Sequence, residues 1–182
     1  AIRNWLECLV ENETILFHHD ETYRSQQIEE IAEAFYKVSA GYPLYLIYSL
    51  RILTYKNKYL SKYEIERLPV CPQGDINQYY NSLWINLSPK AQQVLLQIAC
   101  VDFLWPDRNS LAYCFEDSLG FAQAFEEISF LFEKRLSGIT PFHSSIIVHL
   151  RNKKEYIDQC ESLLKKAKKW LLSSGNGDGN GS

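Results

Sequence analysis

The chain has 182 residues, of which 46% are hydrophobic, 23% charged and 14% aromatic, and its formal net charge at pH 7 is −3. This length and composition are typical of one ordinary globular domain or two small ones. The weak negative charge excludes bulk attraction to nucleic acid or to an anionic membrane surface. The sequence also lacks an apolar run of the roughly 20 residues that a membrane-spanning helix needs.

Two features of the composition concern the origin of the chain. It starts at Ala1 and contains no methionine, so we expect a processed or excised piece of a longer polypeptide. No signal peptide opens it, and its five cysteines are scattered, without a CxxC pair. The pattern favours reduced, partly buried thiols in a cytoplasmic protein over a disulfide scaffold or a zinc site. These cysteines are Cys8, Cys71, Cys100, Cys114 and Cys160.

Apolar residues recur at steps of three and four along nearly the whole chain, which predicts a mainly α-helical fold. Local signals mark several boundaries. Ser25 is a candidate N-cap, Gly41 and Pro43 end one helix and begin the next, Ser61 opens a capping box, and Ser88 precedes a proline. Helices are predicted at residues 25–38, 44–53, 75–85, 88–101, 110–117, 120–135 and 153–172, and also at 2–10, from 61 and from 143.

The segment 136–142 has a different character, because Gly138 and Pro141 predict a loop or a short strand. Three helices followed by this turn, between residues 88 and 142, match the order of a winged helix. A plain helical bundle with a loop fits the periodicity nearly as well, and both interpretations stay open. Residues 173–182 are Gly, Asn and Ser with one Asp, which is typical of a flexible tail.

Motifs that carry catalysis are missing from the sequence, which has no GxxxxGK[ST], GxGxxG, GxSxG or HExxH. We therefore predict no catalytic residue and no metal site. The pair His18–His19 is a weak metal candidate, because adjacent side chains diverge and no ligand set lies nearby. Four lysines between residues 165 and 169 predict an exposed basic face on a packed helix, with a membrane-surface or calmodulin-type role as the minor alternative.

His143 is the most interesting titratable residue. It stands at a predicted helix start, where backbone N–H groups favour an anion, and an imidazole there can donate a hydrogen bond to a phosphate oxygen. The simpler alternative is that His143 caps its own helix or packs at an interface. DNA binding by a winged helix is disfavoured, because the predicted groove-reading helix 120–135 carries Glu126, Glu127 and Glu133.

Several segments taken together resemble the lid and winged-helix region of STAND-class NTPases, the class that includes the NACHT and NB-ARC signalling ATPases. Residues 35–46, FYKVSAGYPLYL, resemble the helix–Gly-x-Pro-Leu–helix element of the lid. Residues 68–84 resemble the join to the winged helix, and residues 88–99 its first helix. Residues 141–146, PFHSSI, resemble the FHxSI or MHD-like element near its end, and residues 156–171 the helix that starts a downstream repeat region.

The resemblance implies a helical lid at residues 1–70, a winged helix at 71–152, a C-terminal helix at 153–172 and a flexible tail at 173–182. It implies the regulatory part of a nucleotide-switched signalling ATPase, as in innate immunity, which is not an enzyme by itself because it lacks the P-loop. The implied partners are an upstream P-loop NTPase domain and a downstream repeat or effector region. Homo-oligomerisation on activation is a further possibility, and neither nucleic acid nor membrane is implied.

The resemblance also implies a nucleotide site. In such proteins the proline of the lid packs against the adenine ring, which here implies Pro43 with Gly41 and Leu44 beside it. The winged-helix histidine contacts the terminal phosphate of ADP, which implies His143, and the absent upstream domain completes the contacts to ADP or ATP. Ser144 replaces the Asp that often follows this histidine. The alternatives are a helical protein-interaction adaptor with no nucleotide role and a nucleic-acid-binding winged helix.

Overall fold

The computed structural model describes residues 1–12, 15, 21–56, 60–71, 75–101, 105, 107–135 and 138–175. These residues form ten α-helices and one two-stranded sheet, so the fold is mainly α, as predicted. The chain divides into two compact units, Ala1–Leu83 (unit 1) and Trp84–Ser182 (unit 2). None of the described helices is long and apolar enough to cross a membrane.

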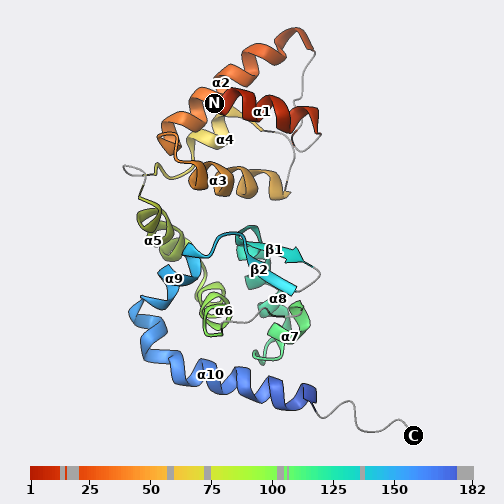
Figure 1. The fold of residues 1–182 in the computed structure, drawn as a ribbon, viewed down its shortest axis with the longest axis vertical. Coiled ribbons are helices and arrows are strands. Elements are labelled where there is room, and N and C mark those ends of the chain that lie inside the picture. The colour runs from red at the N-terminus through yellow and green to blue at the C-terminus, as the bar shows by residue number, and fades with distance from the viewer. Residues whose placement is uncertain are drawn as a thin grey trace, which may run out of the picture. The chain divides into compact units, whose positions relative to one another are not determined.

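Unit 1 is a helical bundle built around one long helix. Figure 1 shows this helix, α2, lying beside α1, and α2 also packs on α3 and α4. The shared core contains apolar and aromatic side chains from all of these helices and from α5, whose residues up to Leu83 belong to unit 1: Leu6, Ile31, Phe35, Tyr45, Tyr48, Ile65, Tyr79 and Tyr80. The helices are α1 (Ile2–Glu11), α2 (Glu21–Ser39), α3 (Pro43–Lys56), α4 (Lys62–Glu66) and α5 (Ile76–Asn86).

The start of α2 differs from the sequence-based expectation. The helix begins at Glu21, so Ser25 lies inside it and the prediction of Ser25 as the N-cap is wrong. Arg3 on α1 donates hydrogen bonds to Ser25 Oγ at 3.4 Å and to Glu29 Oε2 at 3.1 Å. The polar first turns of α2 therefore face side chains of a second helix, which a local pattern does not reveal.

Unit 2 has the element order of a winged helix. Three helices are followed by an antiparallel hairpin in which Phe132 pairs with Pro141 and Arg135 with Gly138. Trp105, between the first and second helices, forms an antiparallel bridge to Ile139 and extends the hairpin. The elements are α6 (Pro89–Ala99), α7 (Arg108–Ala112), α8 (Ser118–Ile128), the 3₁₀ helix η2 (Ser129–Leu131), β1 (Phe132–Arg135) and β2 (Gly138–Pro141).

The third helix of unit 2 is shorter than the sequence indicates. α8 ends at Ile128 and Phe132 starts β1, so the prediction of a helix over 120–135 is wrong beyond Ile128. Cross-strand pairing competes with helical periodicity here. The N–H of Phe142 donates to the Leu131 carbonyl at 2.8 Å, which fixes the chain next to the hairpin. Of the two alternatives predicted for residues 136–142, a loop or a short strand, Gly138–Pro141 form a strand, β2.

Two further helices complete unit 2: α9 (Ser145–Arg151) and α10 (Lys154–Gly175). α10 contacts both α6 and α9, and Figure 1 shows it running along one side of the unit. Gln97 of α6 is buried, and its Nε2 donates to the Leu163 carbonyl of α10 at 3.1 Å. The ring of Trp170 lies 5.1 Å from that of Trp105. These contacts join α10 to α6 and to the segment around Trp105.

Candidate functional site

The predicted lid residues lie in one tight turn between α2 and α3. Gly41 has φ +77°, a conformation that glycine adopts without a steric penalty, and Ala40 before it has φ +50°. The hydroxyl of Ser39 donates to the Phe35 carbonyl at 2.6 Å and accepts the N–H of Gly41 at 3.0 Å. One buried side chain therefore closes α2 and holds the backbone at Gly41.

Pro43 follows this turn as the first residue of α3. Its fixed φ suits that position, where a missing N–H leaves no intrahelical hydrogen bond unmade. The Pro43 ring is exposed, Leu44 is half-buried, and the next residue, Tyr45, is fully buried. Pro43 therefore lies on the surface of the turn, while Tyr45 packs the start of α3 into the core of unit 1.

An open groove of about 470 Å³ adjoins this turn within unit 1. Gly41 lines it together with Arg3, Glu29, Glu33 and Tyr36, so its charges are mixed. Tyr36 is 62% exposed, and its Cε2 would lie 3.4 Å from a Cβ built on Gly41. Sequence reasoning did not single out Tyr36, because periodicity alone does not show which aromatic residues of a helix are exposed.

His143 lies in unit 2, two residues before α9. The N–H of Ser145 donates to His143 Nδ1 at 3.2 Å, and the Ser145 hydroxyl lies 2.8 Å from the same nitrogen. His143 therefore caps its own helix, as the simpler sequence interpretation expects. Both His143 and Ser144 are exposed.

This capping contact determines the chemistry of the imidazole. A ring nitrogen that accepts an N–H carries no proton, so the neutral ring of His143 bears its proton on Nε2. The ring thus presents an N–H donor from an exposed side chain whose orientation is fixed at the other nitrogen. Capping and phosphate binding are compatible, because they use different nitrogens of one ring.

The four residues predicted to bind nucleotide belong to two units. Gly41, Pro43 and Leu44 are brought together by one turn of unit 1, and His143 belongs to unit 2. That all four residues contact one nucleotide stays a prediction.

Other titratable groups of the described residues are poor candidates for catalysis. Burial raises the pKa of the Cys100 thiol to about 12 and that of Cys114 to about 11, so both are protonated and weakly nucleophilic at neutral pH. Burial also raises the pKa of Tyr45 to about 12. Among the described residues no group of three or more His, Cys, Asp or Glu side chains is placed to hold a metal ion. The pair His18–His19 lies outside the described residues.

The helix α8 occupies the position that reads DNA in many winged helices. Its sequence, SLGFAQAFEEI, contains no Lys or Arg, whereas Glu126 and Glu127 are exposed. Glu127 accepts hydrogen bonds from the backbone N–H and the hydroxyl of Ser88, at 2.8 and 2.7 Å. A helix without cations is unsuited to phosphate contacts. Glu133, assigned to this helix from the sequence, lies instead on β1.

Comparison with known proteins gives no match: no protein-family model, no curated protein and no solved structure is significantly similar to the chain.

Proposed function

We propose that the chain is the lid and winged-helix module of a nucleotide-switched STAND-class signalling ATPase. In this proposal it holds ADP together with an upstream P-loop domain and transmits the nucleotide state to a downstream region. The chain contributes no hydrolysis, because its sequence has no phosphate-binding loop of the GxxxxGK[ST] type. Signalling in innate immunity and a cytoplasmic location belong to the same proposal.

The observation that carries the proposal is the position and orientation of His143. The hairpin of a winged-helix topology leads directly into PFHSSI, and there the ring donates through Nε2 because Nδ1 is engaged with Ser145. The proposed role needs an exposed N–H donor on a fixed ring at this point in the chain.

The turn of unit 1 gives independent support. A Gly-x-Pro-Leu sequence that folds into a positive-φ turn, with an exposed proline ring at the start of α3, offers a flat apolar surface to a planar base. The adjoining groove has a volume in the range of small-molecule sites. Gly41 lines this groove, and Pro43 and Leu44, which lie outside its lining, would contact the adenine from the turn beside it.

The switch follows from differential affinity. A ligand shifts a conformational equilibrium only by the difference between its affinities for the two states. A charge-assisted hydrogen bond from His143 to the terminal phosphate of ADP contributes about 1.5–3 kcal/mol. This corresponds to a roughly tenfold to hundredfold bias toward the conformation in which His143 contacts the bound ADP. Exchange for a triphosphate would change this contact.

The decisive experiment uses the full-length polypeptide as its gene encodes it. Bound nucleotide is extracted with acid and quantified by anion-exchange chromatography for the wild type and for His143→Asp. An aspartate keeps an acceptor for the Ser145 N–H, since Asp is a good helix cap, but repels phosphate. We expect near-normal thermal stability and at least a tenfold loss of bound ADP.

Ser144→Ala is the matched control, because Ser144 is an exposed neighbour whose side chain makes no capping hydrogen bond. We expect it to retain ADP. If His143→Asp also retains ADP, the assignment of His143 is wrong. If the wild type binds no nucleotide and no GxxxxGK[ST] is encoded upstream of Ala1, the adaptor alternative replaces the proposal.

A further inference from the structure

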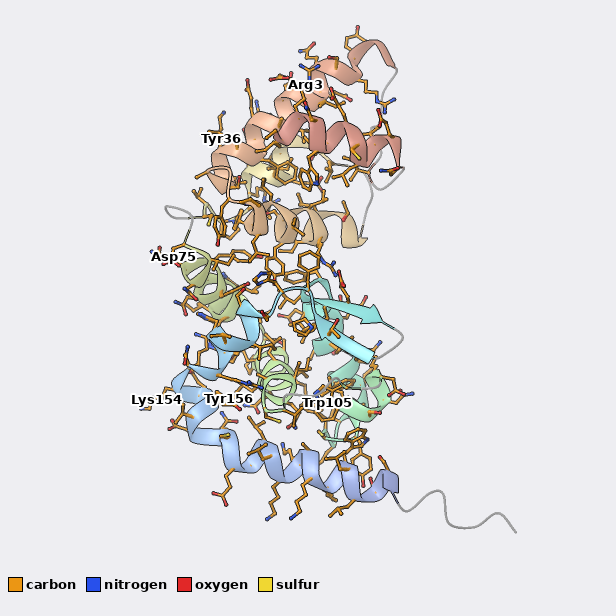
Figure 2. All side chains as sticks on the ribbon, viewed as in Figure 1. Arg3, Tyr36, Asp75, Trp105, Lys154 and Tyr156 are labelled. Carbon is orange, nitrogen blue, oxygen red and sulfur yellow. The ribbon has the colours of Figure 1, made fainter. Side chains whose placement is uncertain are left out.

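α10 carries an apolar stripe that the rest of unit 2 leaves uncovered. Ile157, Leu164 and Leu171 are 65%, 45% and 47% exposed. Their spacing of seven residues is close to two helical turns, so the three side chains lie along one side of the helix, over about 21 Å. Figure 2 shows side chains of α10 projecting away from the other helices of the unit. The stripe is the longest exposed apolar feature on a single described helix.

A different side of α10 already serves the fold. Leu163, Ala167 and Trp170 are buried against unit 2, and the Gln97 amide binds the Leu163 carbonyl. The stripe lies next to this packed side and is therefore presented on a helix that is held in place. Little ordering entropy remains to be lost when a partner binds it.

Two charges of opposite sign flank the stripe, one before and one after Leu164 in the sequence. Glu161 lies three residues before Leu164, and Lys168 lies four residues after it. Both side chains are exposed and flank the same edge of the stripe. If a second α10 runs antiparallel with its Leu164 opposite the first, each Ile157 faces a Leu171, and each Glu161 lies one residue, about 1.5 Å along the axis, from the position opposite a Lys168. The helix is therefore complementary to itself in both charge and apolar pattern.

The residues that follow α10 directly in the sequence do not suit the stripe. Residues 176–182 read NGDGNGS and contain no apolar side chain. Covering the stripe with them would leave its three large aliphatic side chains without apolar contacts.

We propose that a second copy of this chain binds the stripe, forming an antiparallel helix pair between the two α10 helices. A contact along about 21 Å of one helix is at the small end of protein interfaces, so the dimer is weak and concentration-dependent, with a dissociation constant of roughly 10–100 µM. This inference goes beyond the proposed nucleotide function and does not depend on it, since no nucleotide residue takes part.

The first test is sedimentation velocity of the 182-residue chain over a concentration range of about 5–500 µM, which brackets the expected constant. We compare the wild type with Leu164→Glu and with Ser162→Glu. Ser162 is exposed on the same helix but lies about 160° from Leu164, away from the stripe and its flanking charges, so it is a matched control. We expect dimerisation in the wild type and in Ser162→Glu, and its loss in Leu164→Glu. Far-UV circular dichroism checks that α10 stays helical.

A charge exchange tests the antiparallel orientation. Glu161→Lys or Lys168→Glu alone turns the two symmetry-related attractions into repulsions and should weaken the dimer roughly tenfold. The double variant Glu161→Lys/Lys168→Glu should restore wild-type affinity, because the pairs return with their signs exchanged. In a parallel pair Glu161 lies at the height of Glu161 and Lys168 at the height of Lys168. Opposite charges are then not paired, and the double variant would give no rescue.

Each contrary result overturns the proposal. A chain that stays monomeric at about 500 µM, far above the expected constant, shows that another segment or partner covers the stripe. Dimerisation that survives Leu164→Glu, or that Ser162→Glu abolishes equally, locates the interface elsewhere. Single charge variants without effect, or a double variant without rescue, exclude the antiparallel arrangement.

Discussion

The two units of the chain are stabilised in different ways. In unit 2, the helices α6, α7 and α8 each begin at a side chain that accepts a backbone N–H: Ser88 from Ala91, Asp107 from Ser110, and Asp117 from Gly120. In unit 1, the centre is a cluster of four buried tyrosines with ring centroids 4.8–6.0 Å apart: Tyr45, Tyr48, Tyr79 and Tyr80. Local capping signals set the helix starts of unit 2, whereas contacts between distant helices define unit 1.

This difference has a consequence for substitutions. A cap contributes about 1 kcal/mol and concerns one helix end, whereas a buried aromatic side chain contributes to several elements at once. Substitutions in each unit can therefore be chosen to separate local from tertiary contributions.

The largest effect is expected at Trp105, a residue of unit 2 whose contacts are with distant parts of the unit. It is 1% exposed, its carbonyl accepts the N–H of Ile139 at 2.7 Å, and its ring contacts Trp170. Trp105→Ala should cost about 3–5 kcal/mol, the usual cost of removing a large core aromatic. Hydrogen exchange by mass spectrometry should show protection lost in peptides from residues 84–175 and kept in residues 1–71. Equal losses in both units would show that they unfold together.

Alkaline pH should distinguish the units by the type of buried acid. The thiols of Cys100 and Cys114 have pKa values raised by burial to about 12 and about 11, from an ordinary 9. Between pH 9 and the raised pKa of each thiol, the unfolded chain loses the proton and the folded unit keeps it. The free energy of unfolding therefore falls as pH rises. Each thiol contributes a slope of about 1.4 kcal/mol per pH unit.

In unit 1 the corresponding groups are tyrosines with an ordinary pKa of 10; burial raises the pKa of Tyr45 to about 12 and the pKa values of Tyr48 and Tyr79 further. For these groups the loss of stability begins near pH 10, against pH 9 for the thiols. Unit 2 also holds a tyrosine of this kind, Tyr156, whose pKa burial raises from 10 to about 12. With the thiols removed, its loss of stability therefore begins near pH 10, and the double variant Cys100→Ala/Cys114→Ala should move the alkaline onset for unit 2 up by about one pH unit, as urea titrations at stepped pH would measure. An unchanged onset would contradict the assignment to the thiols.

Capping signals explain how much of the fold the sequence predicts. Ser61 and Ser88–Pro89 are capping signals that can be read from the sequence, and the structure confirms both serines as helix caps. The predicted start of α2 at Ser25 and the predicted end of α8 at residue 135 were wrong. The observed ends, Glu21 and Ile128, depend on contacts with α1 and on pairing within the hairpin. Trp105 and Gln97 act across elements, and no local pattern predicts either.

The candidate site also combines features that the sequence predicts with features that depend on packing. The turn at Gly41 and Pro43 follows from residue types with special backbone preferences, and the cap at His143 follows from its place before a helix. The exposure of Tyr36 and the buried Ser39 hydroxyl that supports the turn depend on packing. Sequence alone therefore locates the backbone of the site better than its surroundings.

A matched pair of serines measures what tertiary contacts add to a cap. Ser61 caps α4, and its hydroxyl donates to Glu64 within the same turn at 2.9 Å. Ser88 caps α6 but also binds Glu127 of α8 through its hydroxyl and its N–H. Ser61→Ala should cost about 0.5–1 kcal/mol and Ser88→Ala about 2 kcal/mol in urea unfolding. Equal costs would mean that the contact between α6 and α8 adds nothing.

The smallest effects are expected inside the tyrosine cluster, where one substitution should act with opposite signs at two positions. Tyr80 donates its hydroxyl hydrogen to the Tyr48 hydroxyl oxygen at 3.4 Å, so Tyr48→Phe removes this buried hydrogen bond and should cost about 1 kcal/mol. The buried Tyr79 hydroxyl has no hydrogen-bond partner among the described residues, so Tyr79→Phe removes an unsatisfied group and should stabilise unit 1 by up to about 1 kcal/mol. Equilibrium urea unfolding of both variants measures the sign directly. Destabilisation by both would mean that the cluster acts through its hydroxyls as a network rather than through ring packing.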